Sequence, residues 1–220
     1  MPINDDLPLI GVLALATLLP FLIACGTCYI KFSIVFVMVR NALGLQQIPS
    51  NMTLNGVALL LAMFVMSPIV KSGYENYQNS KTEINSVASI VDFVDNGLEG
   101  YKNYLTRFSD PSLVTFFEKL QHNEDTEGVH QELPDKISII SLLPAYALSE
   151  IKSAFKIGFY IYLPFVVIDL LISCILLALG MMMMSPVTLS VPIKLVLFVV
   201  MDGWTVLTQG LITQYMHLST

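Results

Sequence analysis

The apolar residues of this chain gather into four long stretches, and a polar region separates the second stretch from the third. A helix needs about 20 apolar residues to cross a bilayer core. The four stretches that meet or approach this length lie at 7–39, 52–70, 157–184 and 187–210. A straight helix of about 33 residues would rise about 50 Å. We therefore expect either a break near Pro20 or Gly26 or a tilted helix that ends in a second short piece. The pattern predicts an all-α integral membrane protein with four hydrophobic segments.

The polar region predicts a helical insert. Over residues 84–108 the apolar positions recur at alternating spacings of three and four, which is typical of one apolar stripe on a helix. Asp110 and Pro111 have the residue types of an N-cap and a first-turn proline for a second helix that ends at Gln121, with a polar loop at 122–136. The stripe needs a cover, either the second helix of the insert or another subunit, and the sequence leaves both open. The predicted divisions are hydrophobic helices at 1–72, the insert at 73–140 and a C-terminal hydrophobic hairpin at 141–220.

Composition supports a membrane protein. The 220 residues are 55% hydrophobic and 13% charged, with a net charge of −6, whereas soluble domains carry about 25% charged residues. Residues 71–150 hold six Lys/Arg and thirteen Asp/Glu, a balance of −7, which leaves +1 for the rest of the chain. Nucleic-acid binding is not expected, because it requires a basic footprint.

Charge placement predicts an orientation. Asp5 and Asp6 precede the first apolar stretch, and the first cation, Lys31, follows most of it. This is not the pattern of a typical signal peptide, which has basic residues before its apolar part. The positive-inside tendency then places the N-terminus outside and Arg40 inside, with the acidic insert outside and Lys194 in a short inside hairpin.

Familiar catalytic motifs are missing from the sequence. No Gly–Lys pair exists, so a Walker-type nucleotide site is not expected. Neither Gly-x-Ser-x-Gly nor His-Glu-x-x-His occurs. His122 and His130 lie among acidic loop residues, and their loose spacing favours a solvated surface over a metal site. We therefore expect no enzymatic activity, no cofactor and no metal.

Three cysteines raise one redox alternative. Cys25 and Cys28 have the two-residue spacing of a redox pair, and Cys174 stands alone. A quinone-linked membrane thiol oxidase would need a second cysteine pair in an external loop, and residues 71–150 contain no cysteine. We favour small buried side chains for these positions.

Some ionisable side chains lie in apolar surroundings: Lys31, Asp169, Lys194 and Asp202. Each costs on the order of 3 kcal/mol at a helix centre in a bilayer, so each should face protein or water. They could relay ions or protons, but we favour pairing within or between subunits, as buried charges of the assembly. Asp169 and Lys194 fall at a similar depth if the hairpin turns at 181–184, and are offset by about two turns if it turns at 185–186.

The hairpin carries a run of four methionines: Met181, Met182, Met183 and Met184. Methionine is flexible and polarizable, so a ring of such side chains could form a deformable, dry constriction. The alternative to a constriction is that the four methionines only end a helix or face the lipid. Pairs of small residues four apart, Ala58/Ala62 and Ala154/Gly158, weakly indicate close helix packing.

Several stretches together resemble the FliP/SctR family. They are 27–51, which includes NALGLQQIPSN, 142–159 (LLPAYALSEIKSAFKIGF), Pro164-Phe165, Ile168-Asp169, 179–186 (LGMMMMSP), 192–194 (PIK) and 202–204 (DGW). The resemblance covers nearly the whole chain, and only about 78–136 is unlike a generic member. The sequence of 32–51 especially resembles that of the corresponding subunit of enterobacterial invasion injectisomes. Flagellar members commonly carry a cleaved signal peptide, so the atypical N-terminus favours the virulence branch.

The resemblance implies a core subunit of the type III secretion export apparatus in the bacterial inner membrane, with the insert in the periplasm. Family members form a pentamer, join S-type and T-type subunits and other export-gate components at the base of the inner rod and needle, and pass unfolded secreted proteins. In the family the Met-rich loop is a pore gasket, which maps here onto 181–184. The assembled helices form a cone largely above the membrane plane, so lipids and sister subunits both become partners.

A different class of protein remains as the alternative. Asp169 and Asp202 could serve a small-molecule or ion transporter, and this possibility depends only on their apolar surroundings. Thiol chemistry at Cys25 and Cys28 ranks third.

Overall fold

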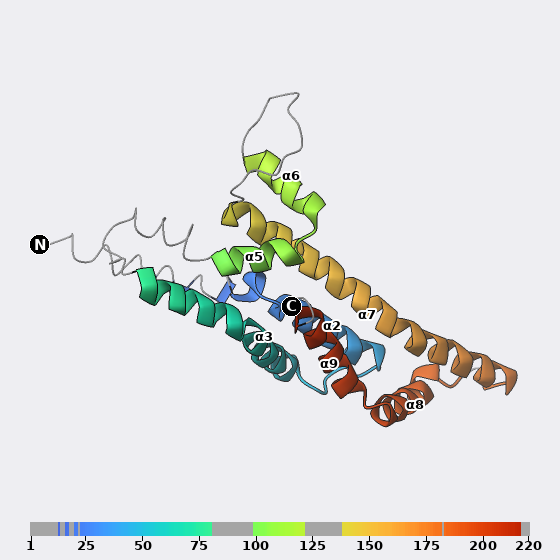
Figure 1. Ribbon diagram of the computed structural model, residues 1–220. Coiled ribbons are helices and arrows are strands. Elements are labelled where there is room, and N and C mark those ends of the chain that lie inside the picture. Colours follow the sequence, from blue (N-terminus) through green and yellow to red (C-terminus); the bar gives the residue numbers. More distant parts are fainter. Residues whose placement is uncertain are drawn as a thin grey trace, which may run out of the picture. The chain divides into compact units, whose positions relative to one another are not determined.

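A computed structural model describes residues 13, 16, 17, 20, 21, 23–80, 99–121, 138–181 and 183–216. Throughout these residues the chain forms helices and short connections, with no strand (Figure 1). The helices are α2 (Tyr29–Ala42), α3 (Asn51–Ser80), α5 (Glu99–Phe108), α6 (Pro111–Gln121), α7 (Ile139–Ala178), α8 (Pro186–Val200) and α9 (Gly203–Met216). The all-α prediction is confirmed for this part of the chain.

Two helices are long and apolar enough to cross a membrane alone, Asn51–Glu75 within α3 and Ile139–Ala178, which is α7. Helices α8 and α9 pass the same test only as a pair, bent by 60°. The described residues therefore supply two spans, or three if the bent pair is one span. The second predicted segment is confirmed by α3, and the first segment, described at 13, 16, 17, 20, 21 and 23–39, contains α2.

The third and fourth segments differ from the prediction. Helix α7 begins at Ile139, well before the expected start at 157, and continues through Pro164 and Asp169. The early part was missed because polar residues such as Glu150 lower its hydropathy without breaking the helix. The predicted segment 187–210 is broken between α8 and α9 at Asp202, which adopts a left-handed φ.

The predicted break near Gly26 is confirmed. Helical residues end at Gly26, and α2 begins at Tyr29 after a short turn. The hydroxyl of Thr27 donates to the carbonyl of Ile23 (2.7 Å) and accepts from the backbone N–H of Tyr29 (3.3 Å). Thr27 thus satisfies one free group on each side of the break.

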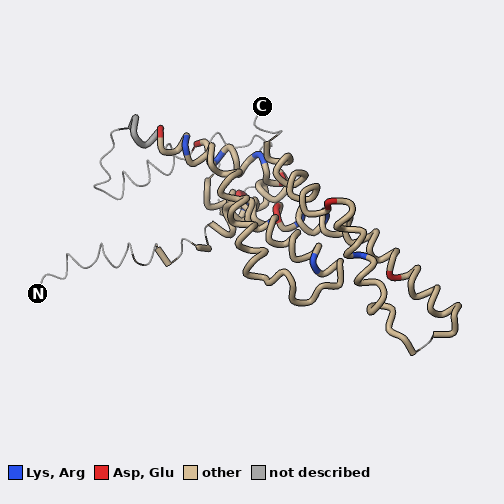
Figure 2. Tube along the Cα trace, turned by 90° about the horizontal axis from the view of Figure 1, so that it is seen from below, with Lys and Arg blue, Asp and Glu red and all other residues tan. Residues whose placement is uncertain are grey.

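The chain forms two compact units. Unit 1 comprises 1–30 and 66–150, and unit 2 comprises 31–65 and 151–220, so α3 and α7 each contribute residues to both. Figure 2 shows how few charged positions interrupt the long helices.

In unit 1 the second helix of the insert is present as predicted. Asp110 precedes α6, its carboxylate accepts from the N–H (3.1 Å) and hydroxyl (2.8 Å) of Ser112, and its carbonyl accepts from Val114 N–H (3.1 Å). Pro111 is the first residue of the helix, where its missing N–H costs nothing. The predicted loop at 122–136, with His122 and His130, lies outside the described residues.

The described end of the apolar stripe is covered by the chain itself. Tyr104 of α5 packs on Tyr146 of α7, with ring centroids 5.4 Å apart and hydroxyls 2.6 Å apart. Tyr101 donates its hydroxyl to the Gly26 carbonyl at 2.8 Å. At this end of the stripe α7 and the chain at Gly26 supply part of the cover, and the two predicted covers, a second insert helix and another subunit, stay predictions. Residues 84–98 of the stripe lie outside the described part.

Burial sets the ionisation of these tyrosines. Burial raises the pKa of Tyr101 from 10.0 to about 12. It also raises the pKa of Tyr104, with smaller contributions from the neighbouring Cys28 and Glu150. Both phenols therefore keep their protons to a higher pH than an exposed tyrosine does.

The core of unit 2 is built around α2, whose buried residues include Phe32, Val35, Phe36 and Val39. Phe36 contacts Trp204 of α9 edge-on, with ring centroids 6.1 Å apart. Small residues permit close packing: Ala58, Ala62 and Ala154 are buried, and Gly158 contacts the side chain of Met38. The small-residue pairs thus serve packing inside this chain.

Candidate functional site

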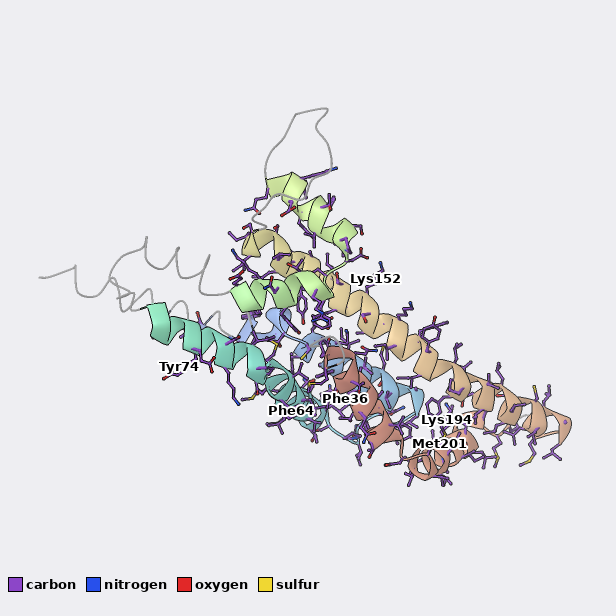
Figure 3. All side chains as sticks on the ribbon, viewed as in Figure 1. Phe36, Phe64, Tyr74, Lys152, Lys194 and Met201 are labelled. Atoms are coloured by element: carbon purple, nitrogen blue, oxygen red, sulfur yellow. The ribbon has the colours of Figure 1, made fainter. Side chains whose placement is uncertain are left out.

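Lys194 joins three helices of unit 2. Its ammonium group on α8 lies 2.6 Å from the Asp169 carboxylate on α7 and donates to the carbonyl of Ala42, the last residue of α2, at 3.2 Å. The lysine side chain is 5% exposed and that of Asp169 is 40% exposed. The predicted pairing of Asp169 with Lys194 is confirmed. Figure 3 marks the position of Lys194.

The position of this junction follows from the hairpin. Asp169 lies nine residues before the end of α7 (178 − 169), and Lys194 lies eight residues after the start of α8 (194 − 186). The two side chains therefore meet at equal depth below the turn. The carbonyl of Ala42 lacks an intrahelical partner at the end of α2, and a cation is favoured there. One ammonium group thus holds a carboxylate and a helix end together.

The hairpin turn falls at the methionine run. Gly180 adopts a φ of 74°, its N–H bonds to Leu177 O (3.0 Å), and the Met181 N–H bonds to Leu176 O (2.9 Å). These two bonds form a Schellman motif, which ends a helix at a left-handed residue. Helix α8 then starts at Pro186, after Ser185 in extended conformation. The turn at 181–184 is the one that permits the pairing.

The described methionine side chains project from the turn. Met181, Met183 and Met184 are all exposed, and nothing is described of the Met182 side chain. A flexible apolar tip is therefore carried on a hairpin whose two helices are joined by the Lys194–Asp169 pair.

Lys31 is buried. Its ammonium group lies 4.7 Å from the centre of the Tyr215 ring on α9, within range of a cation–π interaction. The expectation that Lys31 faces protein is confirmed.

Asp202 is exposed in this chain, and its predicted role as a paired charge of the assembly stays a prediction. It adopts a left-handed φ of 50°, its N–H bonds to Val199 O (3.0 Å), and its carbonyl accepts from the Val206 N–H (3.1 Å). Its carboxylate accepts from the Thr205 hydroxyl at 2.9 Å. Asp202 ends α8 and starts α9, which is why the fourth apolar segment is bent. Gly203 follows because the Phe198 ring leaves no room for a Cβ there.

The sequence interpretation missed Arg40 as a site residue. This side chain is buried at the end of α2, and its Nη1 donates to Asn51 Oδ1 (2.6 Å) and to the carbonyl of Pro49 (3.1 Å). An arginine in the last turn of a helix, followed by a proline- and asparagine-containing turn, was the available signal.

The prediction that the three cysteines are buried is confirmed for one of them. Cys28 is buried as predicted, whereas Cys25 and Cys174 are exposed, and all three are free thiols. The spacing of Cys25 and Cys28 therefore does not correspond to a disulfide in this structure.

These features describe a helical protein with candidate membrane spans and an apolar hairpin that ends in exposed methionines. The sequence profile of the FliP family matches residues 12–211, and the chain belongs to that family. It is 63% identical over 223 residues to the surface presentation of antigens protein SpaP of Salmonella typhimurium, covering 99% of this chain and 100% of the relative. The Yop proteins translocation protein R of Yersinia pestis is 43% identical over 96% of this chain and 97% of its own length.

A plant-pathogen relative extends the comparison. The harpin secretion protein HrcR of Erwinia amylovora is 39% identical, over 91% of this chain and 92% of its own length. The chain is thus a type III secretion export apparatus subunit of the R type.

Proposed function

We propose that this chain is a non-enzymatic, pentameric subunit of the export gate in the bacterial inner membrane, with residues 73–140 in the periplasm. It joins the S-type and T-type subunits and the base of the rod and needle. Together they form a channel through which unfolded virulence effectors and needle components pass. In this proposal 1–72 and 141–220 supply the hydrophobic helices of the cone, and 181–184 supplies the gasket. Family membership supports the export role.

The exposed apolar surface of α7 supports assembly. Only 17% of its most apolar stretch is buried inside the chain. The outward side chains include Leu170, Leu171, Ile175 and Leu177. Such a surface needs lipid or another subunit as cover. A helical cone of sister chains would bury it after insertion.

The observation that carries the gasket proposal is the exposed tip on a braced hairpin. The Lys194–Asp169–Ala42 contacts fix the positions of α7 and α8 below the turn. The methionines beyond them are exposed, unbranched and apolar. Rings of such side chains exclude water from a narrow passage, and they deform when an unfolded chain enters.

The experiment replaces Met181, Met182, Met183 and Met184 together with Ala in an assembled gate whose pore opens readily. We expect ion leakage to rise, because four shorter side chains leave a wider, wetter constriction. A matched control replaces the exposed Met52 and Met63, which lie on α3 away from the turn. Unchanged leakage in the quadruple variant with normal assembly would argue against the gasket.

The contacts of the two apolar-segment aspartates favour structural roles over an ion relay. Asp169 is paired with Lys194, and Asp202 forms a helix corner. Loss of ion flux with intact assembly in Asp169→Asn and Asp202→Asn variants would instead favour the transporter alternative.

A further inference from the structure

Helices α8 and α9 belong to one apolar segment, but each is too short to cross a bilayer. They contain 15 and 14 residues, which corresponds to no more than about 23 Å for either helix, whereas the hydrocarbon core is about 30 Å thick. Together they pass the test for a span, although they are bent by 60° at a corner where Figure 3 labels Met201. A bilayer can therefore hold this segment as one span only if the corner straightens.

The corner leaves backbone acceptors free. A continuous helix would bond the carbonyls of Phe198, Val200 and Met201 to the N–H groups four residues later. Within the described part of the chain, none of these three carbonyls accepts a backbone hydrogen bond, and the N–H of Asp202 bonds to Val199 O instead. Water or protein can supply the missing donors, but hydrocarbon cannot. The bent form is therefore costly in lipid, and the straight helix removes this cost.

Aromatic contacts stabilise the bent form. The rings of Phe198 on α8 and Trp204 on α9 meet edge-on across the corner, with centroids 5.3 Å apart. In a straight helix these residues lie about 9 Å apart along the axis and about 120° apart around it, so their rings do not meet. Trp204 also contacts Phe36 of α2, with centroids 6.1 Å apart. The bend is thus held against the core of unit 2 by contacts that a straight helix loses.

Gly203 favours the bent form over the straight one. A Cβ at this position would collide with the Phe198 ring. On a straight helix residues five apart point in directions about 140° apart, so the collision occurs only in the bend. Glycine also weakens a continuous helix relative to alanine. The preceding Asp202 has a φ of 50°, a conformation that a straight helix does not contain.

We propose that the α8–α9 corner is a hinge with two positions. The segment is a straight span while the single chain lies in the bilayer, and it bends at Asp202 and Gly203 when protein replaces lipid around the corner. The free carbonyls favour the first position in lipid, and the Phe198–Trp204 contact favours the second. The second position rests on the proposed assembly into an export gate, whereas the first concerns the single chain.

The test measures the distance between spin labels on either side of the corner. Val187→Cys and Met216→Cys replace exposed residues of α8 and α9 in a full-length chain whose Cys25, Cys28 and Cys174 are changed to Ala. Pulsed electron paramagnetic resonance is recorded on the single chain in nanodiscs of phosphatidylcholine and phosphatidylglycerol. It is then repeated on assemblies with S-type and T-type subunits, in which labelled chains are diluted with unlabelled ones.

We expect about 44 Å between the two positions in the nanodiscs, as in a straight helix. The assembly should give about 36 Å, as expected for a bend of 60°. The shorter distance in the nanodiscs would overturn the hinge and leave the export function standing. The longer distance in both would overturn it as well. Because the nanodisc measurement needs no partner, it tests the hinge even where the proposed gate does not form.

Gly203→Ala is the decisive variant. It should keep the longer distance and at least the wild-type unfolding temperature in nanodiscs, because alanine extends a straight helix. The yield of assembled complex should fall at least about fivefold, because the Cβ opposes the bend. Gly210→Ala on the same helix is the control, since nothing lies within 4 Å of a Cβ there. Normal assembly of Gly203→Ala, a lower unfolding temperature in nanodiscs, or an equal loss with Gly210→Ala would contradict the hinge.

Discussion

Lys194 and Asp169 form an ion pair of 2.6 Å in which the cation is almost completely buried and the carboxylate is 40% exposed. Removal of the carboxylate and removal of the ammonium group should therefore have different effects on stability. Loss of the carboxylate leaves a buried ammonium group with the Ala42 carbonyl, whereas loss of the ammonium leaves a carboxylate that can turn to solvent. The pair joins α7 and α8 at a similar distance from the hairpin turn.

This asymmetry predicts unequal effects of the two single substitutions. Asp169→Asn should lower the free energy of unfolding by about 2 kcal/mol, between the values for exposed and fully buried pairs. Lys194→Gln should cost less. The measurement is denaturant unfolding in detergent of both single variants and the double variant, with Lys156→Gln as an exposed control on α7.

A double-mutant cycle completes that test. The Asp169→Asn and Lys194→Gln effects should be non-additive, because each removes the other's partner. Zero coupling energy would show that the pair contributes nothing to holding α7 against α8.

Tyr101 predicts an alkaline pH dependence. Burial raises its pKa from 10.0 to about 12 in the folded chain, so the unfolded chain loses this proton first. The corresponding stability is fully present below pH 10 and is lost as the pH rises toward 12. Tyr101→Phe should flatten this part of the unfolding profile and cost about 1 kcal/mol for the lost bond to the Gly26 carbonyl.

Tyr160→Phe is the control for that experiment, because Tyr160 is exposed on α7. An identical alkaline profile for wild type and Tyr101→Phe would contradict the burial of Tyr101 against the Gly26 break.

The effect of a substitution at Gly26 on stability should depend on Tyr101. A Cβ at this position would collide with the Tyr101 hydroxyl, so Gly26→Ala should destabilise the chain by about 1–3 kcal/mol. In a Tyr101→Phe background the collision partner is gone, and the same change should cost less. Unfolding measurements on the two backgrounds test this coupling.

Gly56→Ala supplies the matched comparison. Nothing lies within 4 Å of a Cβ there, and Gly56 is inside α3. This substitution should stabilise the chain by about 1 kcal/mol. Equal destabilisation by Gly26→Ala in the wild-type chain and in the Tyr101→Phe variant would rule out the proposed contact.

Position 202 should require a residue that tolerates a left-handed backbone conformation. Its φ of 50° lies in the left-handed region, so Asp202→Gly and Asp202→Asn should be tolerated, whereas Asp202→Val should cost about 1–3 kcal/mol. Unfolding and secretion assays on the three variants distinguish this role from charge transfer. Failure of export in Asp202→Asn with normal stability would indicate that the charge itself is needed.

Local rules predicted several features because the interactions are close in sequence. The Asp110 cap of α6, the break after Gly26 and the turn at 181–184 each depend on residues within one helical turn of one another. The sequence left two positions open for the hairpin turn, 181–184 and 185–186, and equal spacing from the first of them predicted Asp169 against Lys194. These features needed no knowledge of tertiary structure.

Other features depend on contacts that no local pattern shows. The start of α7 at Ile139 was missed because Glu150 resembles a surface residue in the sequence but is buried in the fold. Asp202 gave no sign of a left-handed corner, since residues other than glycine are uncommon in that conformation. The partners of Arg40 are neutral, so charge patterning could not find them.

The native mass of a mild-detergent extract tests the central claim, assembly into an export gate, most directly. The chain of 24.4 kDa should be measured alone and with co-expressed S-type and T-type subunits. We predict a complex that contains five copies of this chain when the partners are present. A monomer under both conditions would contradict the proposed assembly and, with it, a pore sealed by Met181, Met182, Met183 and Met184.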